Sequence, residues 1–280
     1  MCTAVLPVVW LPVRMSIYNR NNIHVEGSGP KTMVFAHGFG CDQNMWRFLT
    51  ASFMSEYRVV LFDHVGAGKS DLAQYRPEKY SSLNGYADDV LEIIEAAGGA
   101  PVIFVGHSVS SMIGVLAAIK RPEMFERLIL VGPSPCYIND SDYFGGFNRS
   151  DIDSLLATLD SNYLGWSSAT APVIMGNPDR PQLAGELTES FCRTNPEIAK
   201  QFARVTFLSD NRNDLPKVRV PTLILQCSED VIAPDCVGQF VADHIPESML
   251  VRLSATGHCP HLSAPDETIA AIRDYLSSAK

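Results

Sequence analysis

Six short runs of strand-forming apolar residues recur along this chain and alternate with segments of helical pattern. The runs are almost continuously hydrophobic, which is typical of central strands in a parallel sheet that is covered on both faces. Alternation of such strands with helices predicts a doubly wound α/β sheet. The predicted strands are residues 32–36, 58–62, 102–105, 127–131, 222–226 and 250–253, the predicted helices are 44–53, 83–97, 111–120, 235–244 and 267–277, and residues 15–25 are expected to form an edge hairpin.

The alternation stops once, between residues 136 and 215, where only helical patterns occur. We therefore predict an α/β core of residues 15–135 and 216–280, a helical cap of residues 136–215, and a disordered or artefactual leader of residues 1–14. A helical cap over a sheet naturally roofs an apolar pocket. The cap aromatics either line that pocket or form the cap's own core, and the candidates for the pocket are Phe147, Trp166, Phe202 and Phe207.

The net charge and the cysteines of this chain indicate which partners it can bind and in which cellular compartment it is found. A formal net charge of −9 in 280 residues, with no dense Lys/Arg cluster, disfavours binding to nucleic acid or an anionic membrane. Seven scattered cysteines without a CxxC pair indicate reduced thiols in a cytoplasmic protein. The apolar stretch of residues 4–13 is too short to span a bilayer, and Pro7 and Pro12 interrupt it.

The sequence G-H-S-V-S at residues 106–110 lies between a predicted strand and a predicted helix. It approaches the G-x-S-x-G pattern of a nucleophile elbow, in which a sharp turn exposes the serine. Gly106 allows the strand and helix to pass closely, and Ser110 replaces the second glycine with another small residue. A lone serine can instead be a helix N-cap, so the assignment of Ser108 as nucleophile needs a base and an acid.

Both partners follow late strands in the expected order of Ser, acid and His. Asp230 follows the strand at residues 222–226, and His258 follows the last predicted strand, directly after a glycine. Glu229 and His261 are the competing acid and base. Asp230 is preferred because it lies next to the V-I-A-P stretch that begins the following helix, and His261 lacks a preceding glycine. Grouping of His258 with Cys259 and His261 could suggest a metal site, which we disfavour because no matching ligand group occurs elsewhere. Neither metal nor organic cofactor is expected.

The second amide of an oxyanion hole should come from the loop after an early strand. The sequence H-G-F-G at residues 37–40 occupies that place, so we assign the oxyanion hole to the backbone amides of Phe39 and Val109. Alone, this sequence would indicate only a tight turn. The glycine-rich stretch at residues 61–71 lacks the spacing of a phosphate-binding loop and is interpreted as a structural turn.

These motifs resemble the α/β-hydrolase superfamily from Met15 onward, and within it the branch of the stress regulator RsbQ and the plant karrikin and strigolactone receptors. The resemblance implies a triad of Ser108, Asp230 and His258, a V-shaped cap of four helices and a deep hydrophobic pocket. The branch commonly has Phe four residues after the cap tryptophan. Thr170 stands there in this chain, which should enlarge or reshape the pocket. The resemblance is carried by HGFGCDQNMW, VVLFDHVGAGKSD, VGHSVS, LVGPSPCYIND, NYLGW, FLSDNRNDL, LILQCSEDVIAP and GHCPHLSAPDETI.

Two functions of different class fit this sequence. The first is a serine hydrolase that cleaves a small apolar ester or lactone through an acyl-enzyme, slowly and in connection with signalling. The second is a ligand-sensing protein that retains the triad and recruits a protein partner through its cap. Other chemistry on the same fold, such as C–C bond hydrolysis or perhydrolysis, is a third possibility. Dehalogenase and epoxide hydrolase chemistry are disfavoured because the nucleophile position holds Ser108 rather than Asp.

Overall fold

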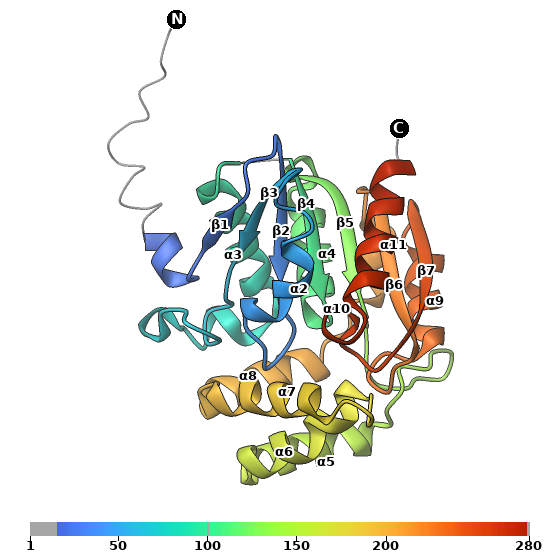
Figure 1. The fold of residues 1–280 in the computed structure, drawn as a ribbon. Coiled ribbons are helices and arrows are strands. Elements are labelled where there is room, and N and C mark those ends of the chain that lie inside the picture. Colours follow the sequence, from blue (N-terminus) through green and yellow to red (C-terminus); the bar gives the residue numbers. More distant parts are fainter. Residues whose placement is uncertain (1–15, 100, 279–280) are drawn as a thin grey trace, which may run out of the picture.

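A seven-stranded, mostly parallel sheet forms the centre of the molecule in the computed structural model, which describes residues 16–99 and 101–278 (Figure 1). The strand order is β1-β3-β2-β4-β5-β6-β7, and every neighbouring pair is parallel except β1 and β3. The predicted leader lies outside the described residues. The strands are β1 (His24–Glu26), β2 (Lys31–Ala36), β3 (Tyr57–Leu61), β4 (Val102–His107), β5 (Phe125–Val131), β6 (Thr222–Glu229) and β7 (Ser248–Thr256).

Helices cover both faces of this sheet. Helices α3 and α4 contact each other on one face, and α2 and α11 contact each other on the other (Figure 1). Strand β4 is buried along its whole length, as its continuous hydrophobic pattern requires. These helices are α2 (Arg47–Thr50), α3 (Leu83–Ala96), α4 (Val109–Lys120), α9 (Asp235–His244), α10 (Pro260–Ser263) and α11 (Pro265–Ser278), and the short 3₁₀ helices are Gln43–Trp46, Leu72–Gln74, Lys79–Ser81, Pro122–Met124 and Arg212–Lys217.

A helical cap is inserted between β5 and β6, as the sequence predicts. Figure 1 shows its helices stacked below the ends of the strands to which the β2 and β5 arrows point, which is the edge where the carboxyl ends of parallel strands meet. None of the described helices is long and apolar enough to span a membrane. The cap helices are α5 (Arg149–Ser161), α6 (Tyr163–Met175), α7 (Pro181–Arg193) and α8 (Pro196–Phe207).

The N-terminal edge of the sheet differs from the expected hairpin. Residues 16–20 are helical, and only β1 is extended there. Strand β1 pairs antiparallel with β3, so that His24 lies opposite Leu61. Because β3 supplies the hydrogen bonds that β1 needs, a second hairpin arm is unnecessary at this edge.

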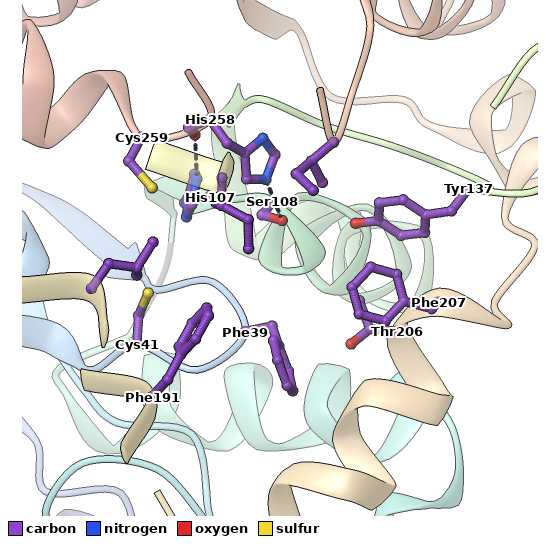
Figure 2. Close-up of a pocket in the computed structure, with 13 residues that line it drawn as sticks. Phe39, Cys41, His107, Ser108, Tyr137, Phe191, Thr206, Phe207, His258 and Cys259 are labelled. Carbon is purple, nitrogen blue, oxygen red and sulfur yellow. Dashed lines mark hydrogen bonds between the residues drawn. The ribbon is translucent and has the colours of Figure 1, made fainter. Parts of the chain in front are cut away.

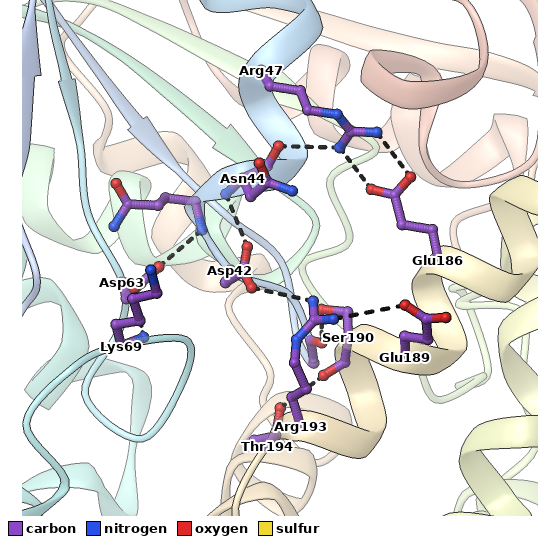
Figure 3. A network of polar contacts seen from close by, with 12 residues as sticks. Asp42, Asn44, Arg47, Asp63, Lys69, Glu186, Glu189, Ser190, Arg193 and Thr194 are labelled. Carbon is purple, nitrogen blue, oxygen red and sulfur yellow. Dashed lines mark hydrogen bonds and ion pairs between the residues drawn. The ribbon is translucent and has the colours of Figure 1, made fainter.

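Polar contacts join helix α7 of the cap to helix α2 and to the loop that follows β2 (Figure 3). The Arg47 guanidinium donates two hydrogen bonds to the Glu186 carboxylate, at 2.6 and 2.8 Å. The Ser190 hydroxyl donates to the Gly40 carbonyl at 2.9 Å. The cap is therefore joined to the same loop that carries the predicted oxyanion residue Phe39.

Candidate active site

Ser108 occupies a strained turn between β4 and α4. Its φ is +56°, a conformation that non-glycine residues rarely adopt and that is often associated with functional sites. Its backbone N–H donates to the Val131 carbonyl of the neighbouring strand at 2.8 Å. A Cβ at Gly106 would lie 2.5 Å from the Ser110 carbonyl oxygen, so only glycine fits this crossing of strand and helix. The local geometry is that of a nucleophile elbow.

The side chains of Ser108, His258 and Asp230 form one hydrogen-bonded chain. His258 Nε2 lies 2.8 Å from Ser108 Oγ, and His258 Nδ1 lies 2.7 Å from Asp230 Oδ2. All three residues are buried. The histidine follows β7 and the aspartate follows β6, which brings together at one sheet edge residues that are distant in sequence. This arrangement suits a catalytic triad.

Asp230 is held in the ionised form. The other carboxylate oxygen, Oδ1, accepts hydrogen bonds from the backbone amides of Ile232 and Ala233 at 2.8 and 3.0 Å. Burial alone would raise the pKa of Asp230, but His258 and these two amides outweigh it, so that the pKa is lowered. An ionised carboxylate on Nδ1 fixes the tautomer in which Nε2 can accept the Ser108 proton.

The competing acid and base lie elsewhere. Glu229 is exposed at the end of β6, beside Thr256 of β7. His261 is fully buried, with its ring 4.6 Å from that of Trp46 and 4.5 Å from that of His107. Neither is hydrogen-bonded to Ser108 or His258 in the described part of the chain.

One of the two predicted oxyanion residues directly follows Ser108 in the chain, and the other lies in a loop that comes close to Ser108. Val109 is the first residue of α4, where backbone amides have no acceptor within the helix. The loop of Phe39 approaches closely, because a Cβ at Gly38 would lie 3.3 Å from Ser108 Cβ and 2.5 Å from His107 Nδ1. The positions of this loop and of the first turn of α4 are compatible with an oxyanion hole formed by the Phe39 and Val109 amides, which stays a prediction.

An apolar pocket opens at Ser108 and His258 beneath the cap (Figure 2). Among the predicted pocket residues it includes Phe207. Among the described residues that line it, none is Lys, Arg, Asp or Glu. The lining residues are Phe39, Cys41, His107, Ser108, Tyr137, Ile174, Leu187, Phe191, Thr206, Phe207, Ile232, His258 and Cys259.

The other predicted pocket residues lie outside this lining. The Trp166 and Phe202 rings pack against the Phe39 ring, with centroids 6.1 and 5.7 Å away. They therefore contact a residue that lines the pocket without lining it themselves. Thr170 lies instead in a groove on the cap between α5 and α6, which Trp166 also borders. Phe147 is half-buried in the loop before α5, where its amide donates to the Tyr137 carbonyl. A change at Thr170 would therefore not reshape the pocket directly.

Two polar pocket residues, Tyr137 and Thr206, were not anticipated. Figure 2 shows the Tyr137 hydroxyl pointing towards Ser108. Burial raises the pKa of Tyr137 to about 12, so its hydroxyl remains a proton donor near neutral pH. Tyr137 lies in the loop that follows β5, at the carboxyl edge of a parallel sheet, and that position is a sequence signal that could have indicated it.

The structure also gathers His107, Cys259 and His261, whose candidate ligand atoms lie within 4.8 Å of one another. This trio differs from the one considered from sequence, because His258 is engaged with Ser108 and Asp230. His107 Nε2 is hydrogen-bonded to the His258 carbonyl at 2.8 Å, and burial together with His258 lowers the pKa of His107 to about 3. His107 is thus a neutral side chain that supports the loop of the candidate base.

A nucleophile on a strand–helix turn, an acid and a histidine after later strands, and a helical cap over the site together define an α/β hydrolase. The chain belongs to the alpha/beta hydrolase family, which matches residues 33–271. The predicted fold class is thereby confirmed.

Its relatives include plant proteins of the branch that the sequence motifs indicated. A karrikin insensitive 2 receptor of Petunia hybrida is 40% identical over 257 residues, covering 91% of this chain and 95% of the relative. A strigolactone esterase of Arabidopsis thaliana is 38% identical over 256 residues, covering 91% and 96%. The structure of a hydrolase from Oleispira antarctica superposes with a TM-score of 0.92 at 42% identity, covering 94% of this chain and 97% of that one.

Proposed function

We propose that this protein is a serine hydrolase that cleaves small apolar carboxylic esters or lactones through an acyl-enzyme. The observation that carries the proposal is the hydrogen-bonded chain from Asp230 through His258 to Ser108, at the floor of an apolar pocket. A relative that is 38% identical is named a strigolactone esterase, which supports the ester or lactone class.

The reaction follows from the positions of these groups. Ser108 Oγ attacks the substrate carbonyl carbon while His258 Nε2 takes the hydroxyl proton, and the Phe39 and Val109 amides stabilise the oxyanion. The ester C–O bond then breaks, and His258 returns the proton to the leaving alkoxide. Water then gives a proton to His258 and attacks the acyl carbon. The bond between Ser108 Oγ and the acyl carbon breaks, His258 returns the proton to Ser108 Oγ, and the carboxylic acid is released. The reaction needs no oxidant or reductant, and water is the only co-reactant.

A second proposed function is ligand sensing with recruitment of a protein partner. A relative that is 40% identical is named a receptor, and the triad alone does not separate the two functions. The cap carries exposed apolar side chains that a partner could cover, with Leu164 and Val173 on α6 exposed by 57% and 58%. The proposed ligand is the same small apolar ester or lactone.

We propose a cytoplasmic location and no association with nucleic acid or a membrane. The six cysteines that the structure describes are all free thiols, which is typical of a reducing compartment. The net charge of −9 opposes binding to polyanions.

The test is hydrolysis of p-nitrophenyl acetate and of a strigolactone analogue by the wild type and by Ser108→Ala, measured in single-turnover and steady-state experiments. Loss of a triad nucleophile should lower the rate by on the order of 10⁴-fold or more. Ser168→Ala, an exposed serine on α6, is the matched control. Sustained turnover that disappears only in Ser108→Ala supports the hydrolase. A single burst followed by near silence supports the sensor, and full activity in Ser108→Ala contradicts both.

A further inference from the structure

Thr206 is an unusual member of the pocket lining. It lies in the last turn of α8, is 1% exposed, and faces a pocket formed mainly by aromatic and aliphatic side chains. Ser108 and His258 already have roles in the proposed reaction, and Figure 2 shows the Tyr137 hydroxyl pointing towards Ser108. Thr206 therefore offers a polar group that the proposed reaction does not use.

The hydroxyl of Thr206 is unsatisfied, unlike those of comparable threonines in this protein. A helical threonine commonly donates to the carbonyl four residues earlier, and Thr158, Thr188 and Thr268 do so at 2.8–2.9 Å. Thr206 Oγ1 is buried and has no hydrogen-bond partner within residues 16–99 and 101–278. A buried hydroxyl without a partner is unfavourable, so a ligand that supplies one gains affinity.

The position of Thr206 indicates which part of a ligand it would meet. Figure 2 shows Ser108 and His258 on one side of the pocket and Thr206, next to Phe207, on another. When the scissile carbonyl is at Ser108, a group near Thr206 belongs to a remote part of the ligand. The described lining contains no Lys, Arg, Asp or Glu, and the lowered pKa of His107 keeps that side chain neutral.

We propose that the Thr206 hydroxyl donates a hydrogen bond to an uncharged oxygen of the ligand, such as a ring ether or carbonyl, that is remote from the scissile bond. The substrate class is then an apolar ester or lactone with a second oxygen acceptor, rather than a plain hydrocarbon ester. This proposal rests on the proposed hydrolase function, because Ser108 fixes the reacting end. Thr206 acts as a specificity-determining residue.

The test compares matched ring esters on the wild type and Thr206→Val, which removes the hydroxyl while keeping the branched shape. The substrates are p-nitrophenyl esters of cyclopentanecarboxylic acid, of its two ring-oxygen analogues with oxygen at position 2 or 3, and of its 3-oxo analogue. We expect Thr206→Val to lower kcat/KM for at least one oxygen-bearing ester by about five- to tenfold relative to the all-carbon ester. Thr206→Ser should retain the wild-type preference.

Control measurements separate this result from packing effects and from failure of the hydrolase proposal. Thr188→Val, on the neighbouring helix α7, removes a hydroxyl that is satisfied locally and should leave the preference unchanged. Equal effects of Thr206→Val on all four esters, or no effect on any, would overturn the role of Thr206. If the wild type hydrolyses none of the esters in a Ser108-dependent manner, the hydrolase function itself fails. In that case binding of the corresponding methyl esters, measured by calorimetry on wild type and Thr206→Val, still decides the role of Thr206.

Discussion

Ser110, the residue that departs from the G-x-S-x-G pattern, joins the nucleophile elbow to the loop of residues 37–40. This loop carries Phe39 and is called the oxyanion loop below. The Ser110 hydroxyl donates to the His37 carbonyl at 2.5 Å and accepts from His64 Nε2 at 2.8 Å. Burial, followed by the nearby His37, lowers the pKa of His64 well below its usual value, so His64 is a neutral donor. Ser110 thus fixes the backbone immediately before Gly38 and Phe39.

Ser110→Gly should therefore lower activity, although it makes the motif more regular. The substitution leaves a buried carbonyl and a buried imidazole unpaired, and the oxyanion loop loses its tie to the elbow. We expect kcat for p-nitrophenyl acetate to fall by roughly tenfold with little change in KM, as for a weakened oxyanion hole. Ser168→Ala is again the control. If only the unfolding midpoint falls while kcat of the folded protein is kept, Ser110 has a structural role alone.

The triad could be predicted from the sequence, whereas most of the pocket could not. Ser108, Asp230 and His258 each follow a recognisable buried strand, and the carboxyl ends of parallel strands meet at one edge. Which face of a cap helix looks inward depends instead on how the helices pack. Trp166 and Thr170 lie four residues apart on one face of α6, and both border the outer groove.

At the scale of elements, the C-terminal end of helix α6 is joined to the loop that carries His258. The His258 amide donates to the Ile174 carbonyl at 2.9 Å. Asn177, just beyond the helix, donates from Nδ2 to the Met175 and Thr256 carbonyls at 2.9 and 3.0 Å. Asn177 has a φ of +55°, which asparagine tolerates better than most residues. A cap helix therefore helps to place the candidate base.

Asn177→Ala should destabilise this junction. The substitution removes three side-chain hydrogen bonds, the third being from Arg180 to Asn177 Oδ1, and adds backbone strain, at a cost in unfolding free energy of about 2–3 kcal/mol. Asn177→Gly relieves the strain but not the loss of hydrogen bonds, so its stability should lie between those of Asn177→Ala and the wild type. Urea unfolding measures both differences, and the pH profile of esterase activity reports on His258. Equal stability of all three proteins would show that the junction contributes nothing.

The boundaries of elements were harder to predict than their order. Within the predicted cap, α6 extends over Tyr163–Met175 and includes both Gly165 and Pro172. Residues that oppose helix formation in isolation are tolerated there because α6 packs against α5 and α7. The expected edge hairpin was wrong for a related reason, since strand β1 finds its partner in β3, over 30 residues away.

At the scale of the whole molecule, the alternation of strands with helices and the insertion of a helical cap could be predicted from the hydrophobic pattern. Continuous apolar runs predict buried parallel strands, and the single long interruption predicts an insertion. The alternation of strands and helices does not predict which polar side chains are buried in the core. His64, His107 and His261 are all buried around the candidate site, and each has a lowered pKa, chiefly because burial disfavours the charged ring.

These buried histidines should make the protein lose stability in mild acid. In the unfolded chain each histidine binds a proton below a pH of about 6.5, whereas in the folded protein it stays neutral, so stability is complete above that pH and falls below it. For His107 the loss continues down to the folded pKa of about 3. Each such group contributes up to ~1.4 kcal/mol per pH unit.

The contribution of one group can be isolated with His261→Leu. Neither ring nitrogen of His261 has a hydrogen-bond partner among the described residues, so an apolar replacement removes the titration without breaking a bond. Urea unfolding at pH 7.5, 6 and 5 should show a shallower fall in unfolding free energy for His261→Leu, by up to ~1.4 kcal/mol per pH unit. The exposed His24→Gln variant is the control. If the unfolding free energy of His261→Leu and of the wild type falls equally with pH, His261 is protonated in the folded protein as readily as in the unfolded chain. The acid sensitivity would then have to come from other groups.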